Sequence, residues 1–299
     1  DLFCDSCNNS VNSAILAAGK CAESISWYIS ENFVLYINGK GNMNSFRVDE
    51  SPWKDYTDKI TEIHFSDGIN SIGEFAFYNC RELTKVFMPD VLVNIEASAF
   101  YGCEKLTYIN IPDCLYYIGD KAFFGCKSIK NIILPESAVK IGKSVFSGCT
   151  NLESVIIRSD LREIPERMFE NCELLSEIRI NQVISGIGDR AFFNCRSLSS
   201  FSLATVKTLG KESFRNCETL SDINLKKLVN IPEYAFSGCK NIAKISTFSY
   251  CQFLFFFFSA PLTELYGKHY NGKYCCYYIR NRHAVPYAIF SNEHRQYNQ

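Results

Sequence analysis

The sequence predicts an α/β solenoid of stacked units, with a parallel sheet on one face and short helical or turn segments on the other. The first observation is the spacing of eight cysteines, which is 23 residues five times and then 22 residues twice. A period of about 20 to 29 residues is the signature of a leucine-rich repeat array. The cysteines are Cys80, Cys103, Cys126, Cys149, Cys172, Cys195, Cys217 and Cys239.

Other positions of each 22–23-residue unit keep the same period. A phenylalanine stands three residues before every repeat cysteine, from Phe77 to Phe236, and Leu or Ile stands three residues after it. Further apolar residues occur six residues after the cysteine and eight residues before it. One unit cannot bury such a surface alone, so we expect neighbouring units to stack and share a continuous core.

Within a unit, the elements are expected in a fixed order. Residues such as Val86 and Met88 alternate as the buried side of a short strand, and Pro89 ends the strand because proline has no N–H to donate. An inward isoleucine follows, with Gly or Pro after it, as in Ile118-Gly119. A short helical or turn segment such as 121–124 comes next, and Asn-Cys or Gly-Cys closes the unit.

The period divides the chain into four parts. Residues 60–247 are predicted to form the solenoid, and residues 20–59 an N-terminal β cap, because the ends of a solenoid need covering. Residues 1–19 are an N-terminal extension, and residues 248–299 are an aromatic-rich tail. Since the sequence begins at Asp1 with neither Met nor an apolar leader, we expect a processed, trimmed or partial chain.

The tail departs from the repeat. Fifteen of its 52 residues are Phe or Tyr, and the stretch 253–258 is the most apolar in the chain. This stretch is too short to span a membrane. Three interpretations stay open: a C-terminal cap over the last coil, an ill-ordered extension, or a product of altered reading at the gene level. In each case, an exposed run of phenylalanine would promote aggregation.

The composition argues against two classes of protein. Hydrophobic residues make up 47% of the chain and charged residues 21%, so the chain can form a folded core. Lys and Arg number 31 against 32 Asp and Glu, and this balance gives no support to a nucleic-acid-binding protein. The sequence has no apolar run of about 18 residues, so we expect no transmembrane helix.

The repeat resembles a known family. The pattern Ser-Ile-Gly, Ala-Phe, Asn-Cys, Leu and Val between residues 71 and 86, which recurs as far as Ile245, resembles the BspA-type leucine-rich repeat. The stretch with Trp27 and Trp53 is similar to the cap that precedes such arrays, so the resemblance covers about residues 20 to 247. It implies a cell-surface or secreted protein of a host-associated microbe, a surface antigen or adhesin. It supplies no catalytic residues.

The cysteines do not form a metal-binding pattern. Zinc sites use closely spaced ligand pairs, which a 23-residue spacing does not supply. Disulfides between neighbouring coils are not sterically excluded. We nevertheless predict stacked, buried thiols, because free cysteine behaves as a small apolar residue. Cys4 and Cys7 form a lone C-x-x-C, for which we expect a local disulfide or a pairing with Cys21 if the protein is extracellular.

Catalysis is not predicted. In the solenoid, His64 lies on the outward side of the first strand without a motif around it, and a lone surface histidine is ordinarily a solvated side chain. An enzymatic interpretation rests only on four residues of the tail, namely His269, Cys275, His283 and His294. We therefore predict no enzymatic activity, no cofactor and no metal.

The outward side of the strands is the candidate binding site. Positions six and eight after each repeat cysteine point inward, so positions five and seven must face the surface expected to be concave. The candidate ligand-binding residues are Phe87, Tyr108, Asn110, Ile133, Ile156 and Arg179. Four of them form an apolar and aromatic strip flanked by polar groups, as protein-binding patches often are. The preference of strands for such residues is the simpler explanation.

Two functions remain. The first is a non-enzymatic surface or secreted protein that binds a protein or glycan ligand, such as a host matrix or cell-surface protein. The alternative is a cytoplasmic scaffold for protein–protein interaction, in which fifteen reduced cysteines would be ordinary. The oxidation state of the cysteines outside the repeat distinguishes the two.

Overall fold

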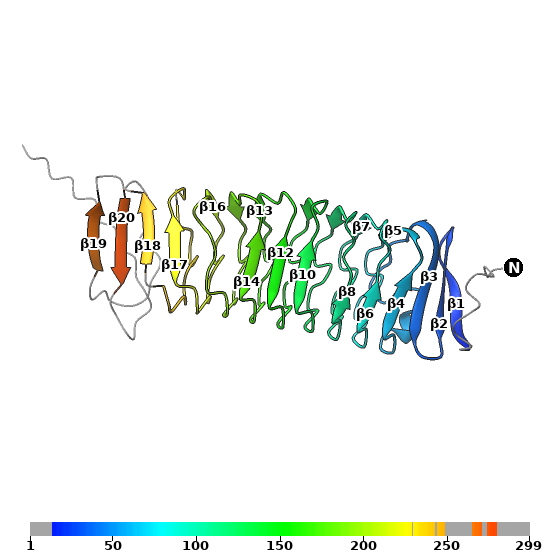
Figure 1. Cartoon of the computed structure of the whole chain (residues 1–299). Helices are drawn as coiled ribbons and strands as arrows, with labels where there is room; N and C mark the ends of the chain where they lie inside the picture. The colour runs from blue at the N-terminus through cyan, green and yellow to red at the C-terminus, as the bar shows by residue number, and fades with distance from the viewer. Residues whose placement is uncertain (1–13, 229, 243, 249–264, 271–273, 280–299) are drawn as a thin grey trace, which may run out of the picture.

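The computed structural model of the chain describes residues 14–228, 230–242, 244–248, 265–270 and 274–279. Short strands follow one another along a single axis and build an elongated solenoid (Figure 1). Strands of successive units pair in parallel, as in Val155 of one unit opposite Ile178 of the next. The predicted solenoid with a parallel sheet is therefore confirmed.

One face of the solenoid carries the strands that the sequence predicts, here called the first row. Most of their inward residues are buried, among them Val86, Ile132 and Val155, whereas those of β8 and β14 are only partly buried. Hydrogen-bonded pairing is interrupted between β8 and β10 and again between β14 and β17. The strands are β4 (Glu62–Phe65), β6 (Lys85–Phe87), β8 (Tyr108–Ile109), β10 (Asn131–Leu134), β12 (Ser154–Ile157), β14 (Glu177–Ile180), β17 (Asp222–Leu225) and β18 (Lys244–Phe248).

A second row of short parallel strands lies on another side of the stack. The sequence predicts only an inward isoleucine there, but that residue and the one before it pair with the next coil, as in Ile95 opposite Ile118. Both isoleucines are fully buried. The strands are β5 (Gly68–Ile72), β7 (Asn94–Ile95), β9 (Tyr117–Ile118), β11 (Lys140–Ile141), β13 (Glu163–Ile164), β15 (Gly186–Ile187) and β16 (Thr208–Leu209).

The α/β description and the helical segments are not confirmed, because the segment before each repeat cysteine consists of turns. Among the described residues, the only helical element is the 3-10 helix η2 (Lys54–Tyr56). The backbone N–H groups of Phe77 and Asn79 donate to the Ala99 and Tyr101 carbonyls of the next coil (2.8 and 2.7 Å). Positive φ at Asn79 (56°) also breaks the helical path. These donors thus join two coils, whereas in a helix they would bond within one.

The turns that stand in place of helices in the described coils affect the shape of the solenoid. Helices side by side are about 10 Å apart, whereas paired strands are about 4.8 Å apart, so a layer of helices opposite a sheet would bend the stack. Here the turns also bond directly from coil to coil, and the solenoid in Figure 1 is nearly straight. The face that the sequence predicts to be concave, which carries the first row, is therefore nearly flat along the stack (Figure 1).

The core is organised around one aromatic stack. The phenylalanines three residues before the repeat cysteines lie ring on ring from Phe77 to Phe236, with centroids 5.0 to 6.0 Å apart. Trp53 continues the stack beyond Phe77 at 5.3 Å. Its indole N–H donates to the Ala76 carbonyl (2.8 Å), so this buried polar group has a partner. Trp53 is therefore the N-terminal end of this ring stack, where Trp27 of the cap contacts it edge-on at 5.8 Å.

A three-stranded antiparallel unit precedes the solenoid. It consists of β1 (Ile15–Ala22), β2 (Ile25–Ser30) and β3 (Val34–Asn42), and β1 begins five residues before the predicted start of the cap. The first half of β3 pairs in parallel with β4, and its second half pairs with β5. Through β3, the cap continues both rows of the solenoid.

At the other end, the strand order is β17-β18-β20-β19. β19 (Leu265–Tyr270) and β20 (Tyr274–Ile279) form an antiparallel hairpin, and β20 pairs with β18. Residues 249–264 and 280–299, including the phenylalanine run, lie outside the described residues. The three interpretations of the tail stay predictions.

Candidate functional site

The outward face of the first row carries the candidate binding residues. Tyr108 and Ile133 are among the most exposed large apolar side chains, at 48% and 45% of their full accessible surface. Phe87 and Ile156 on the same face are half-buried. The strands fix these directions, because alternate residues of a strand point to opposite sides.

Five ring side chains on this face form a continuous series, here called the aromatic row: Tyr28, Tyr36, His64, Phe87 and Tyr108. The ring centroids of successive members are 4.6, 5.2, 4.4 and 5.4 Å apart. The first three contacts are stacked, with interplanar angles of 13°, 20° and 21°, and the last is tilted by 43°.

Strand register explains this alignment. Tyr28 of β2 is paired with Tyr36 of β3, Tyr36 with His64 of β4, and His64 with Phe87 of β6. Tyr108 of β8 is paired with Lys85, so it meets Phe87 diagonally. The row therefore runs across the strands, from the cap into the solenoid.

Charged groups beside the row neutralise each other. The Lys85 ammonium contacts a Glu62 carboxylate oxygen at 2.8 Å, and the other oxygen lies 3.5 Å from His64 Nε2. The hydrogen bond from Lys85 lowers the pKa of the Glu62 carboxyl group. Burial raises the pKa of the Tyr36 hydroxyl, and the nearby Glu62 charge raises it further. Tyr36 is therefore a neutral phenol at physiological pH.

The remaining predicted residues are not members of the aromatic row. The Asn110 side chain donates to the Met88 carbonyl and accepts from the Met88 N–H, both at 2.8 Å, so its amide holds two coils together. Ile133 and Ile156 are paired on β10 and β12. Arg179 binds Glu177 at 2.7 Å on the exposed surface of β14.

Sequence reasoning missed two members of the row and undervalued a third. Tyr28 and Tyr36 lie in the cap, where no cysteine marks the period. The signal that could have found them is the alternation Leu35-Tyr36-Ile37, which matches Ile63-His64-Phe65 of the first repeat strand. His64 lies on the outward side, as its position in the repeat predicts, but it stacks between Tyr36 and Phe87 and is not a lone residue.

The repeat units of this chain match a known protein family. A family model described as BspA type leucine rich repeat region matches residues 54–174 and 162–266, in six copies. The chain belongs to this family. The resemblance drawn from the repeat is thus confirmed. No curated protein matches the chain.

Among solved structures, the chain is similar to several leucine-rich repeat proteins. One from Eubacterium ventriosum has 21% identity and a TM-score of 0.48, with 77% of each chain covered. A T. pallidum leucine rich repeat protein has 26% identity and a TM-score of 0.46, covering 59% of this chain and 89% of that one. A leucine rich cell surface protein from Faecalibacterium prausnitzii has 18% identity and a TM-score of 0.39, covering 77% and 88%.

The repeat cysteines of this BspA-type chain are all buried and unbonded to one another. Burial raises the pKa of the Cys80 and Cys239 thiols to about 12, so neither is a nucleophile at neutral pH. Cys21, the proposed partner of Cys4 or Cys7, is also a buried free thiol. Cys4 and Cys7 lie outside the described residues. Cys114 is free and exposed.

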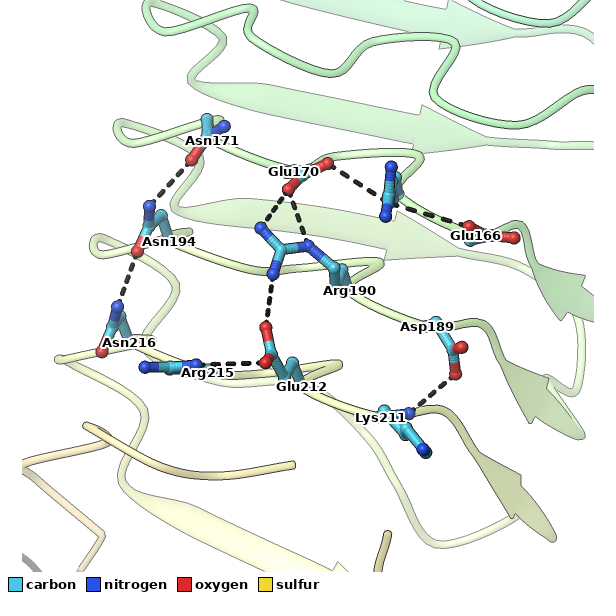
Figure 2. A network of polar contacts seen from close by, with 11 residues as sticks. Glu166, Glu170, Asn171, Asp189, Arg190, Asn194, Lys211, Glu212, Arg215 and Asn216 are labelled. Atoms are coloured by element: carbon cyan, nitrogen blue, oxygen red, sulfur yellow. Dashed lines mark hydrogen bonds and ion pairs between the residues drawn. The ribbon is translucent and has the colours of Figure 1, made fainter. Parts of the chain in front are cut away.

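The turn side of the BspA-type repeats holds a polar network (Figure 2). Arg190 binds Glu170 of the preceding coil and Glu212 of the following one. Beside it, the Asn194 amide donates to Asn171, and Asn216 donates to Asn194, both at 2.8 Å. Each contact joins successive coils, so this network stabilises the stack.

An open groove of about 720 Å³ beside the second row mixes cationic and anionic side chains, and its Lys143 is paired with Glu166 at 2.9 Å. The described residues contain no group of three His, Cys, Asp or Glu placed to hold a metal ion. In the same part of the chain, no helix is long and apolar enough to cross a membrane.

Proposed function

We propose that this BspA-type chain is a non-enzymatic binding protein, cell-surface or secreted, that recognises a protein or glycan ligand through the first row. The observation that carries this proposal is the aromatic row on the outward face. Contiguous apolar surface rimmed by polar groups marks interaction sites. Because the strands hold the side chains in place before binding, little ordering accompanies association. The surface assignment rests on what the family resemblance implies.

The binding site is tested with the double substitution Phe87→Ala and Tyr108→Ala. The purified chain is applied to immobilised matrix proteins, cultured cells and an oligosaccharide array. We expect the double variant to lose at least about tenfold in affinity for whichever ligand binds, because aromatic anchors dominate binding energies. Its melting temperature should stay close to that of the wild type, since both side chains lie on the outward face of the strands and neither belongs to the buried core.

A matched control is available beside the second row. Tyr116 and Val139 are exposed to 40% and 42% and belong to neighbouring coils. The variant with Tyr116→Ala and Val139→Ala removes a similar apolar surface and should bind normally. If the Phe87/Tyr108 variant and the wild type bind the ligand with equal affinity, the first row is not the binding site.

The alternative, an intracellular scaffold, is favoured by one observation. Cys114 is an exposed free thiol, and exposed thiols persist most readily in reducing compartments. We expect a membrane-impermeant amine reagent to label the chain on intact cells that produce it. A chain that is expressed but labelled only after lysis would replace the surface assignment with the intracellular scaffold.

A further inference from the structure

The stacking within the aromatic row determines which parts of the rings a ligand can reach. Tyr36 and His64 each have a ring stacked on both sides, at 4.6 and 5.2 Å for Tyr36 and at 5.2 and 4.4 Å for His64. Their faces are therefore covered, and what remains for solvent is their edges. Ring edges carry partial positive charge, and ring faces partial negative charge. Sugars stack their C–H groups on open ring faces, so Tyr36 and His64, in the middle of the row, offer no face to a glycan.

The distance between successive rings of the aromatic row is close to the rise of one turn of an α-helix. Successive ring centroids are 4.4 to 5.4 Å apart across four intervals. The turns of an α-helix repeat about every 5.4 Å, so side chains at i, i+3 or i+4, and i+7 advance at nearly the same interval. Same-side residues of an extended strand are about 6.6 to 7 Å apart and would lose register within a few rings.

The charges on the same face argue for an apolar contact. Lys85 is paired with Glu62, and Arg179 with Glu177, so these ions are already neutralised within this chain. A partner that places a charge against such a pair meets opposite charges side by side and gains little. An uncharged stripe of aliphatic and aromatic side chains is the complementary surface.

We propose that the aromatic row binds the apolar stripe of an amphipathic α-helix from a protein partner, with the helix lying across β2, β3, β4, β6 and β8. This inference rests on the proposed function and narrows it from a protein or glycan to one helical element. Helices bound through i, i+3, i+4 and i+7 anchors are an established mode of recognition. About three to four helical turns would cover the row.

The test uses the full chain and three sets of probes. One phage library displays helix-forming peptides of about 15 residues with randomised side chains, which covers about four turns. A second displays peptides of the same length that carry central proline residues and cannot form such a helix. An array of neutral and acidic oligosaccharides is probed in parallel. Every binder is then measured against the Phe87→Ala/Tyr108→Ala and Tyr116→Ala/Val139→Ala variants.

We expect helical clones with apolar residues at i, i+3 or i+4, and i+7. Their affinity should fall at least about tenfold in the Phe87/Tyr108 variant, stay unchanged in the control, and vary less than about twofold between low and high salt. If oligosaccharides or proline-containing peptides bind in a row-dependent way and no helical clone does, the helical ligand is wrong, but the aromatic row remains the binding site. If no probe binds, or if every bound probe keeps its affinity for the Phe87/Tyr108 variant, both the helical ligand and the proposed binding face are wrong.

Discussion

The repeat cysteine makes a hydrogen bond that an apolar residue of similar size cannot make. From Cys103 to Cys239, each thiol donates to the carbonyl of a phenylalanine in the preceding coil, as from Cys149 to Phe123 at 3.3 Å. The thiol is a weak donor, and it is the second donor to that carbonyl, because the backbone N–H of the cysteine three residues later already donates to it, as from Cys126 to Phe123 at 3.2 Å. The spacing predicts that this position is small and buried. The hydrogen bond depends on the turn geometry, which the spacing does not reveal.

The aromatic stack of the core gives a prediction at the scale of one residue. Phe123 is fully buried between Phe100 and Phe146, at 5.3 and 5.7 Å. We expect Phe123→Ala to lower the free energy of unfolding by about 3 to 5 kcal/mol, because the cavity left between two rings cannot close. Urea unfolding followed by circular dichroism measures this loss.

The next residue in the chain is the matched control. Phe124 is half-buried on the turn side and stacks on Tyr101 at 4.7 Å. Phe124→Ala leaves a gap open to water, and its cost should be clearly smaller. Equal losses for the two variants would show that the inward and outward sides of this turn are wrongly assigned.

At the scale of the elements, the period predicts which residues point inward but not the backbone between them. The first-row strands follow from residues such as Val86 and Ile132, which alternate with polar neighbours. The turns do not follow, because Lys121 and Arg190 adopt positive φ (56° and 53°), and neither residue type signals this conformation. The second row consists mostly of two-residue strands, too short for alternation to be visible.

The candidate site was predictable to the same extent. Phe87 and Tyr108 were found because they lie at fixed distances from the repeat cysteines. Tyr28 was not, because it joins the row through antiparallel pairing with Tyr36, and a hairpin register is set by turn geometry rather than by the repeat period. The side-chain contacts of Asn110 were equally hidden, since its amide bonds to the backbone of another coil.

At the scale of the whole molecule, the stack behaves as a one-dimensional array. Each coil contacts mainly its neighbours, so stability grows from repeated interfaces and depends on covered ends. Trp53 and the cap strands cover the first coil, and β3 extends both rows over it. The aromatic row crosses this junction, so a ligand bound there contacts the cap and the solenoid together. Ligand binding should therefore stabilise the folded state of the cap relative to its unfolded state.

The column of buried thiols predicts how the whole array responds to alkali. Burial raises the pKa of Cys80 and Cys239 from 9.0 to about 12, and it raises those of Cys172 and Cys195 well above 9.0. The folded chain therefore keeps protons that the unfolded chain releases. The stabilisation is complete below about pH 9 and is lost as the pH rises towards 12. Each such thiol makes the free energy of unfolding fall by up to about 1.4 kcal/mol per pH unit in that window.

Urea unfolding between pH 8 and pH 11, in the presence of a reductant, measures this slope. The variant with Cys172→Ala and Cys195→Ala should lose stability at pH 8, because two core groups are truncated, but its stability should then decline less steeply with pH than that of the wild type. Leu175→Ala, a core truncation three residues after Cys172 that removes no titrating group, should lower stability at pH 8 and retain the wild-type slope. If the cysteine variant keeps the same slope as the leucine variant, the thiols do not control alkaline unfolding. A flatter slope in the cysteine variant alone would show that the residue marking each repeat also sets the upper pH limit of the solenoid.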